Sequence, residues 1–484
     1  MIVRQSGELK VKGAAQHDAS LDASRKVILN ARESLIHKGE ALLDGLLEKS
    51  GSTRRPFILL VDNDEASASA IVAACQQKKT CVLIPLPKKK DLLPYVVRET
   101  GINLFVDPQA KLTTDLPCDK KSPVPWLTDS TSEEGGVCML TSGSTGLPKI
   151  VFCSWTSMLV QGTATYQRLF PNGPCRFVCA SSIAHAYAIN ALFAIYTSPF
   201  GANSELFLDM DSFVPQADSS SDKPTILFGT PGTYSRLSAS SHSVSLHNIQ
   251  AFSAGVALPP ALHESLKIRF GLHVLQNYGA TETGGICVED VNASRYVGIS
   301  RPNLQAVGLP WPGVQVRVDV PSCGRLCCPD ERGEIAVLTP WQCMGYVQQM
   351  MLIPISRDGF YYTGDGGYVD DDNLVFVGQR LRDPVRFRYQ GFDLFVPPQQ
   401  VEAALLKNPS VSDVLVPLVL DDLDDKSTPK KPIALVVAPS TDEMALRKWC
   451  AENLPPILAD IEIHLVEFLP CSPAGKLMYS ITKQ

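Results

Sequence analysis

The sequence predicts an α/β protein. We expect a large N-terminal domain of mostly parallel sheets with flanking helices, a barrel-like β subdomain within it, and a small α+β C-terminal domain. Short apolar runs alternate with helix-length segments between residues 57 and 275, which indicates parallel strands joined by crossover helices. From about 305 to 380, short runs are interrupted by Gly and Pro, which indicates antiparallel strands. The length of 484 residues also exceeds what one hydrophobic core supports.

The N-terminal elements follow one another in a regular order. Apolar positions at helical spacing within 20–49 predict an amphipathic helix. Strands are then predicted at 57–61, 81–84, 104–106, 176–180, 225–229 and 272–275. One helix is predicted to end near Lys78, and further helices are predicted over about 91–99, 185–196 and 231–239. The stretch 108–125, which is rich in Pro, Lys and Ser, is predicted to be a surface connection.

The composition changes again past Gly378, where the chain becomes basic and then alternates between strand-like and helical segments. We therefore predict an N-terminal domain at 1–381, with its barrel-like part at about 305–380, and a small mobile C-terminal domain at 382–484.

Charge and hydropathy restrict the class of protein. A formal net charge of −6 gives no basic excess for a general nucleic-acid binder. No apolar run approaches the roughly 18 residues that span a bilayer, and the N-terminal residues lack the apolar core of a secretion signal. We predict a cytoplasmic protein with no membrane span and no nucleic-acid partner. Whether it is a monomer or a homodimer stays open.

The stretch Thr141–Lys149 reads Thr-Ser-Gly-Ser-Thr-Gly-Leu-Pro-Lys and follows the apolar run Val137–Leu140. Its glycines let the backbone curl so that N–H groups and hydroxyls point at one anion, and its lysine adds a mobile positive charge. We expect a phosphate here, and a flexible turn is the alternative. The candidate nucleotide-binding residues are Thr141, Ser142, Gly143, Ser144, Thr145, Gly146 and Lys149.

Three later segments carry complementary chemistry. Asn277–Gly285 follows a predicted parallel strand and offers an aromatic face, a hydroxyl and a hard carboxylate, which suit a base, a phosphate oxygen and a hard cation. Tyr361–Asp365 ends in a carboxylate that can accept two hydrogen bonds from a cis-diol. Leu469–Lys476 ends in a lysine on a turn stiffened by Pro and Gly.

The four segments occur in the order found in the adenylate-forming superfamily, and from about residue 137 to 476 the chain resembles this family of acyl-CoA synthetases, peptide-synthetase adenylation domains and firefly luciferase. The resemblance implies ATP and Mg²⁺ as ligands. It places Tyr278 at the adenine and Asp365 on the ribose hydroxyls, and it makes Gly279 a nucleotide-binding residue. Thr281 would contact the α-phosphate, Glu282 would hold the metal, and Lys476 would be the catalytic lysine, with Thr281 and Glu282 as further catalytic residues.

The resemblance also implies a hinge, a thiol channel and an acyl pocket. Arg380 matches a ribose- and phosphate-contacting arginine, Arg382 the hinge, and Gly391 the channel for the thiol. The segment 378–398 departs from the family pattern because no arginine directly follows Gly378, and an ordinary basic strand is the alternative. The acyl-substrate pocket is expected at His185, Gly229, Gly255 and Gly284, with Gly255 also near the adenine.

The function that the resemblance implies is ATP-dependent activation of a carboxylic acid to an acyl-AMP with release of pyrophosphate, then transfer to the thiol of coenzyme A. An aromatic or short-to-medium acyl group is expected. One alternative is a ligase that loads the pantetheine of an acyl carrier protein. Alternatives of another class are an ATP-hydrolysing enzyme and an inactive nucleotide-binding protein.

Overall fold

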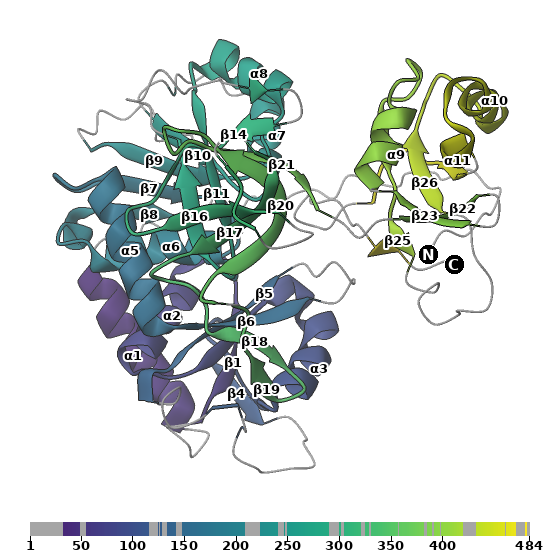
Figure 1. Cartoon of the computed structure of the whole chain (residues 1–484). Helices are drawn as coiled ribbons and strands as arrows, with labels where there is room; N and C mark the ends of the chain where they lie inside the picture. The colour runs from purple at the N-terminus through teal and green to yellow at the C-terminus, as the bar shows by residue number, and fades with distance from the viewer. Residues whose placement is uncertain are drawn as a thin grey trace, which may run out of the picture.

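A computed structural model of the chain is shown in Figure 1. It describes residues 32–48, 55–115, 124, 126–127, 133–141, 148–208, 223–240, 246, 249–289, 300–301, 304–320, 325–328, 331–356, 358–381, 385–389, 392–396, 398–419, 432–459, 461–470 and 480–481.

The first sheet has eight strands in the order β19-β18-β6-β5-β2-β1-β3-β4. Its central strands β5, β2, β1 and β3 are parallel, and the strands on either side of them are antiparallel. The strands are β1 (Phe57–Val61), β2 (Cys81–Pro85), β3 (Leu104–Asp107), β4 (Leu112–Asp115), β5 (Gly136–Thr141), β6 (Lys149–Ser154), β18 (Gly345–Gln348) and β19 (Met351–Ile353).

The second sheet has seven strands in the order β15-β12-β11-β10-β9-β7-β8. Strands β8, β7, β9, β10 and β11 are parallel, whereas β12 and β15 continue the sheet in antiparallel fashion. The strands are β7 (Arg176–Cys179), β8 (Glu205–Phe207), β9 (Thr225–Gly229), β10 (Ile249–Ser253), β11 (Val274–Ala280), β12 (Gly284–Val288) and β15 (Leu309–Pro310).

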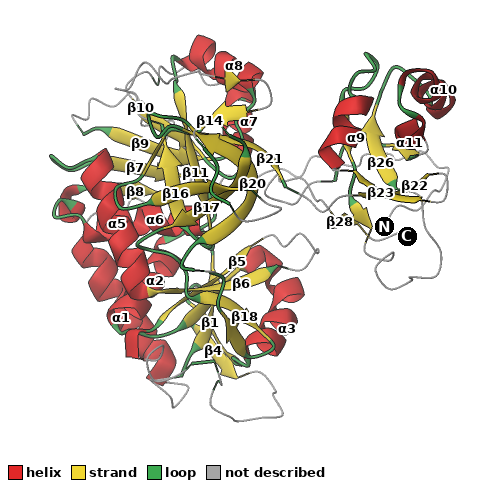
Figure 2. Cartoon of the chain, viewed as in Figure 1, coloured by secondary structure: helices red, strands yellow, loops and turns green. Residues whose placement is uncertain are grey.

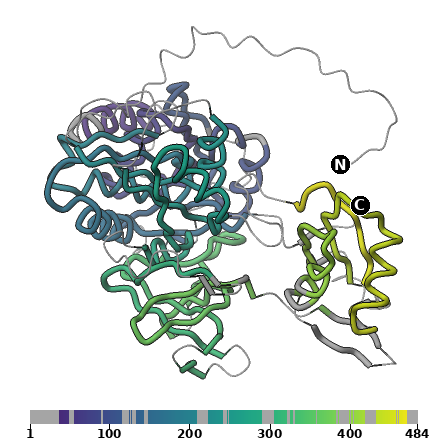
Figure 3. The backbone as a smooth tube through the Cα atoms, turned by 90° about the horizontal axis from the view of Figure 1, so that it is seen from above, coloured from purple at the N-terminus to yellow at the C-terminus, as the bar shows by residue number. Residues whose placement is uncertain are grey.

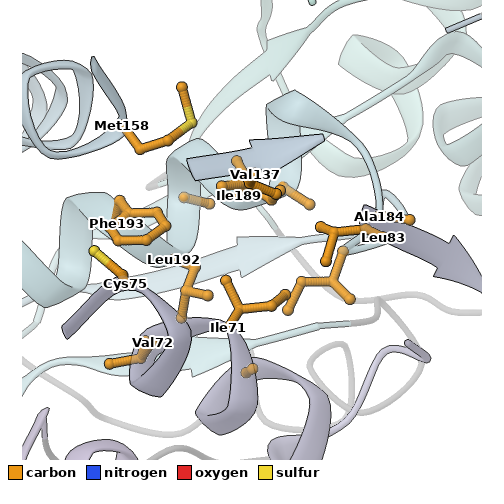
Figure 4. Close-up of a cluster of buried hydrophobic side chains, with 14 of the residues drawn as sticks. Ile71, Val72, Cys75, Leu83, Val137, Met158, Ala184, Ile189, Leu192 and Phe193 are labelled. Atoms are coloured by element: carbon orange, nitrogen blue, oxygen red, sulfur yellow. The ribbon is translucent and has the colours of Figure 1, made fainter. Parts of the chain in front are cut away.

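Helices cover both faces of the two sheets (Figure 2). Successive residues of β1 enter different cores, because strand side chains alternate between faces: Phe57 packs in the largest core and Ile58 in another. The largest core joins both sheets through α1 (Arg32–Glu48), α2 (Glu65–Gln76), α5 (Trp155–Leu169) and α6 (Ala186–Thr197). Figure 4 shows α2 and α6 side chains of this core lying together. The outer faces carry α3 (Lys89–Thr100) on the first sheet, and α7 (Pro231–Ala239) and α8 (Pro260–Phe270) on the second.

A third, antiparallel sheet has the order β13-β14-β21-β20-β17-β16. Its strands are β13 (Ser300–Arg301), β14 (Leu304–Ala306), β16 (Gln315–Asp319), β17 (Gly333–Leu338), β20 (Tyr361–Val369) and β21 (Val375–Arg380). One of its two cores also contains Ile286 and Cys287 of β12, so this sheet packs next to the end of the second sheet.

The elements that follow β21 form a body of their own in two views at right angles (Figures 1 and 3). Their core contains described residues between Val385 and Ile463 and none from the sheets above. The elements are β22 (Val385–Tyr389), β23 (Phe392–Val396), α9 (Pro398–Leu405), β24 (Asp413–Leu415), β25 (Leu418–Val419), β26 (Ile433–Val437), α10 (Glu443–Asn453), α11 (Pro456–Ala459), β27 (Glu462–Leu465) and β28 (Ser480–Ile481). The exact boundary at 381/382 stays a prediction.

The predicted α/β class is confirmed, together with the predicted antiparallel strands, and β1 and β9 have the bounds that the sequence predicts. Three details differ. Strand β4 lies within the stretch predicted as a surface connection, because Leu112–Asp115 pairs with β3. Residues 345–353 join the first sheet through β6 rather than the barrel-like part. Strand β11 runs on to Ala280, so the motif Asn277–Gly285 begins inside a strand. No helix in the described part of the chain has the length and apolarity needed to cross a membrane.

Candidate active site

The predicted phosphate loop connects two antiparallel strands of the first sheet. Thr141, the last residue of β5, pairs with Lys149, the first residue of β6, so the two ends of this stretch lie side by side. Lys149 is exposed, and its ammonium lies 4.8 Å from the centroid of the Tyr346 ring on the neighbouring strand β18. This distance is within the range of a cation–π interaction.

The motif Asn277–Gly285 includes the end of β11, the start of β12 and the turn between these two paired strands. Gly284 has a φ of +63°, and a Cβ there would lie 2.5 Å from Trp341 and 2.6 Å from Gln161. The turn therefore requires glycine at this position. It is also fixed from outside, because the Thr339 hydroxyl donates to the Thr283 carbonyl at 2.9 Å and Cys343 N–H donates to the Glu282 carbonyl at 2.8 Å.

Within this turn, the Glu282 side chain is buried, with 7% of its surface exposed. Its Oε1 accepts a hydrogen bond of 2.7 Å from the Tyr346 hydroxyl, and that hydroxyl lies 3.5 Å from the Tyr361 hydroxyl. Burial raises the pKa of the Tyr346 phenol, and the negative charge of Glu282 raises it further. The phenol therefore stays protonated and donates its hydrogen to the carboxylate.

A second group of predicted residues meets on β11, β20 and β21. The Tyr278 hydroxyl donates to Asp365 Oδ2 at 2.7 Å. Arg380 lies opposite Asp365 in the sheet register, with its Nη1 at 3.6 Å from Asp365 Oδ1, and it donates to the Thr363 carbonyl at 3.0 Å. Burial raises the pKa of Tyr278, and the Asp365 charge adds to this. The Asp365 side chain keeps 18% of its surface exposed, so a ligand can reach it.

Strand β20 connects the group around Glu282 with the group around Asp365. Tyr361 at its beginning lies near Tyr346 and Glu282, and Asp365 on the same strand contacts Tyr278 and Arg380. The structure therefore brings together predicted residues that are more than 200 positions apart in the chain, from Thr141 and Lys149 to Asp365 and Arg380. Gly279 and Thr281 lie in the same hairpin as Tyr278 and Glu282.

Sequence reasoning missed Tyr346 as a site residue. The strand that carries Tyr346 reads Gly-Tyr-Val-Gln and has no local feature that points to a ligand. Tyr361 belongs to the motif that ends at Asp365. Membership of this motif was the one feature of the sequence that pointed to Tyr361 as part of the site.

The predicted acyl-pocket residues lie at neighbouring ends of elements. Ala254 N–H donates to the Gly229 carbonyl at 3.2 Å, which places the ends of β9 and β10 together beside Gly255, whose φ is +96°. His185 is the exposed N-cap residue of α6, and its helix reaches the same strands because the Tyr187 ring stacks on Phe228 at 4.4 Å. Gly284 lies apart from these residues along the chain, in the turn with Glu282.

Eight predicted site residues lie outside the residues that the structure describes: Ser142, Gly143, Ser144, Thr145, Gly146, Arg382, Gly391 and Lys476. Their roles stay predictions.

A metal site made entirely of protein ligands is absent from the described residues, which contain no suitable group of three or more His, Cys, Asp and Glu side chains. A single buried carboxylate near a lysine does fit Mg²⁺, because proteins often hold this cation with one or two carboxylates together with substrate phosphates. Glu282 is the residue of the site that provides this carboxylate.

Glu289, which follows β12, gives a pH-dependent prediction for stability. Its Oε2 accepts from Gln276 N–H at 2.7 Å, and burial raises its pKa from 4.5 to about 7. Because the native pKa is the higher one, the contribution of Glu289 is complete below pH 4.5 and is lost as the pH rises through about 7. We expect Glu289→Gln to raise the free energy of unfolding by about 1–3 kcal/mol at pH 8 and by much less at pH 5.

Denaturant unfolding at both pH values measures this effect, with the exposed Glu264→Gln as the matched control. An equal change at pH 5 and pH 8 would contradict the assignment of the raised pKa to Glu289.

Comparison with protein families gives a match to the model described as "AMP-binding enzyme" over residues 58–347. Among curated proteins, the chain is 29% identical to the 2-succinylbenzoate–CoA ligase of Bacillus licheniformis over 348 residues, which are 72% of this chain and 69% of that protein. It is 24% identical to the long-chain-fatty-acid–CoA ligase of Bacillus subtilis over 402 residues, which are 81% of this chain and 70% of that protein.

Solved structures share the fold over most of the chain. The o-succinylbenzoate CoA synthetase of Bacillus subtilis, in complex with its acyl-adenylate intermediate, superposes with a TM-score of 0.67 at 19% identity and covers 92% of both chains. The same enzyme in complex with ATP and magnesium ion gives a TM-score of 0.67 at 20% identity, covering 92% of this chain and 93% of that one.

Proposed function

We propose, because this chain belongs to the AMP-binding enzyme family, that it activates a carboxylic acid with ATP and then transfers the acyl group to coenzyme A. One observation carries the proposal: strand β20 connects the residues around Glu282 and Tyr346 with the residues around Asp365. Lys149 and Glu282, which suit phosphates and a cation, contact Tyr346, which lies near one end of the strand. Asp365, which suits a ribose, lies further along it.

In the first step, a carboxylate oxygen of the acid attacks the α-phosphorus of ATP. An O–P bond forms, the bond from the α-phosphorus to the bridging oxygen breaks, and pyrophosphate leaves. Lys149 attracts the phosphates, and Asp365 accepts hydrogen bonds from the ribose hydroxyls. Glu282 would hold Mg²⁺, which supplies positive charge to offset the growing negative charge on the phosphates. Tyr278 offers its ring to the adenine.

In the second step, the thiol sulfur of coenzyme A attacks the acyl carbonyl carbon. A C–S bond forms, the C–O bond to AMP breaks, and the thiol proton passes to solvent. Rotation of the C-terminal domain about Arg382 would move Lys476 out of the site and let the thiol of coenzyme A enter. Gly391 would line the channel through which the thiol enters. The pantetheine of a carrier protein is the alternative acceptor. We also propose that the protein is cytoplasmic and that it is either a monomer or a homodimer.

Product analysis tests the first step. The purified protein is incubated with ATP, Mg²⁺ and single aromatic or short-to-medium aliphatic acids. We expect AMP and pyrophosphate in equal amounts, and only with an accepted acid. Formation of ADP and phosphate would instead indicate the ATP-hydrolysing alternative, and the absence of any product with every acid would favour an inactive nucleotide-binding protein. Supplying coenzyme A or a pantetheine-loaded carrier protein to the reaction then identifies the acceptor.

Replacing Asp365 by Asn tests the ribose contact. The amide oxygen can still accept from the Tyr278 hydroxyl, whereas the amide nitrogen cannot accept from a ribose hydroxyl. We expect the KM for ATP to rise about 10-fold or more, because the ribose hydroxyls lose a charged hydrogen-bond acceptor. The preference of the wild type for ATP over 2′-deoxy-ATP should shrink as well. Steady-state kinetics with both nucleotides measure these changes.

The matched control is Asp358→Asn, which changes an exposed carboxylate that pairs with Arg317. If Asp365→Asn keeps the wild-type ratio between the two nucleotides, the ribose assignment is wrong.

A further inference from the structure

We propose that Tyr346 is a positioning residue, which keeps the phosphate-side cation Lys149 apart from the metal-side carboxylate Glu282. This inference rests on the proposed function, because it assigns those two charges to different parts of one nucleotide–metal complex. It concerns a residue that neither the sequence motifs nor the family match singles out.

Tyr346 contacts both charged side chains, each through a different part of its own side chain. Its hydroxyl donates to Glu282 Oε1 at 2.7 Å, and its ring lies 4.8 Å from Lys149 Nζ. Lys149 and Glu282 contact the same side chain but form no ion pair with each other. A lysine on a flexible four-carbon stem readily pairs with a nearby carboxylate. Such a pair would remove the carboxylate from the cation and the ammonium from the phosphates. We infer that Tyr346 prevents this pair, because its ring holds the Lys149 ammonium while its hydroxyl holds the Glu282 carboxylate.

The placement of Tyr346 is fixed by backbone contacts and does not require the charged groups of Lys149 and Glu282. Its strand β18 pairs with β6, and the turn after it is held on α3. There, the buried Glu99 accepts from Gln349 N–H at 2.8 Å through Oε2, and its backbone carbonyl accepts from Met350 N–H at 2.6 Å. Gln349 and Met350 both have positive φ angles, of 49° and 60°. Since non-glycine residues rarely adopt this conformation, these bonds define the turn and with it the strand.

Two substitutions separate the two contacts. Tyr346→Phe keeps the ring near Lys149 and removes the hydrogen bond to Glu282. Loss of a bond that orients a metal-binding carboxylate typically lowers metal affinity about 10-fold or more. We therefore expect Tyr346→Phe to weaken Mn²⁺ binding in the presence of ATP by about 10-fold, and to leave ATP affinity in EDTA unchanged.

Tyr346→Leu removes the ring as well, so that Lys149 can pair with Glu282. We expect this variant to bind ATP less tightly in EDTA, by about 10-fold, the scale of one charge-assisted interaction. Adding Glu282→Gln to Tyr346→Leu should restore most of the metal-free ATP affinity, because the competing carboxylate is gone. A role limited to packing predicts no such restoration.

The experiment measures Mn²⁺ binding by electron paramagnetic resonance and ATP binding by calorimetry, on the full chain, with thermal unfolding as the check of folding. The control is Tyr362→Phe, which also removes a tyrosine hydroxyl. The Tyr362 hydroxyl forms hydrogen bonds with Asp319 and Arg317. It should change neither affinity. Unchanged Mn²⁺ affinity in Tyr346→Phe, or no restoration in the double variant, overturns the proposal.

These readouts do not depend on turnover. A wild type that releases no AMP with any acid, but whose variants shift the two affinities as expected, contradicts the proposed function and leaves the role of Tyr346 standing. A wild type that turns over while the variants keep its affinities contradicts the role of Tyr346 alone. A wild type that binds no ATP contradicts both.

Discussion

Replacing Glu282 by Gln should lower kcat/KM for acid-dependent pyrophosphate release by about 100-fold to 10,000-fold, which corresponds to the several kcal/mol that a bound metal supplies in phosphate chemistry. Glu282 is the buried carboxylate of the site. The amide of Gln has the same shape, and its oxygen can still accept from the Tyr346 hydroxyl. The turn should therefore keep its conformation while losing the negative charge that attracts the cation.

Rates of pyrophosphate release over a range of Mg²⁺ concentrations measure this loss. We expect the Glu282→Gln variant to need much more Mg²⁺ for its residual activity. The matched control is Glu289→Gln, which makes the same chemical change at the far end of the same hairpin, where the side chain contacts Gln276. It should retain activity. A Glu282→Gln variant with the wild-type rate at ordinary Mg²⁺ would show that this carboxylate does not hold the metal.

Most central strands could be predicted because their side chains are buried on both faces, although β10 in the second sheet was not predicted. All five residues of β1 are buried, so the strand is a continuous apolar run of strand length. Helices α2, α3, α6 and α7 have bounds within a few residues of the predicted ones, whereas α8, between β10 and β11, was not predicted.

The partner of a strand could not be predicted in the same way. Residues 345–348 have the local pattern of a short strand among Gly and Pro, which places them equally well in the antiparallel sheet. Their pairing with β6, nearly 200 residues earlier in the chain, depends on side-chain packing between distant segments. Tyr346 reaches Lys149 and Glu282 only through this long-range pairing, and its role could not be read from the residues around it.

The site shows the same division. Tyr278, Glu282 and Asp365 could be predicted because each belongs to a motif with its own chemistry. The hydrogen bond between Tyr278 and Asp365 was not predicted, since it joins two motifs that the sequence presents separately. Local motifs therefore identified the groups that suit a ligand, whereas the contacts that orient those groups depend on the fold.

Replacing Lys476 by Ala should separate the two half-reactions. Lys476 lies outside the described residues, and its role follows from the motif alone. If it offsets the repulsion between the carboxylate and the α-phosphate, its loss should slow acyl-AMP formation by about 100-fold to 1,000-fold. Thioester formation from synthetic acyl-AMP and coenzyme A should stay near the wild-type rate, because that step creates no new bond to phosphorus.

Single-turnover assays of each half-reaction measure the difference, with the exposed Lys407→Ala as a control among the same C-terminal elements. Equal loss in both half-reactions would mean that the substitution disturbs the C-terminal elements as a whole. A selective loss of the first half-reaction requires that Lys476 reaches the nucleotide during adenylation and is dispensable afterwards. The C-terminal elements would then have to occupy two positions during one catalytic cycle, since the thiol must approach the carbonyl carbon that Lys476 faces in the first step.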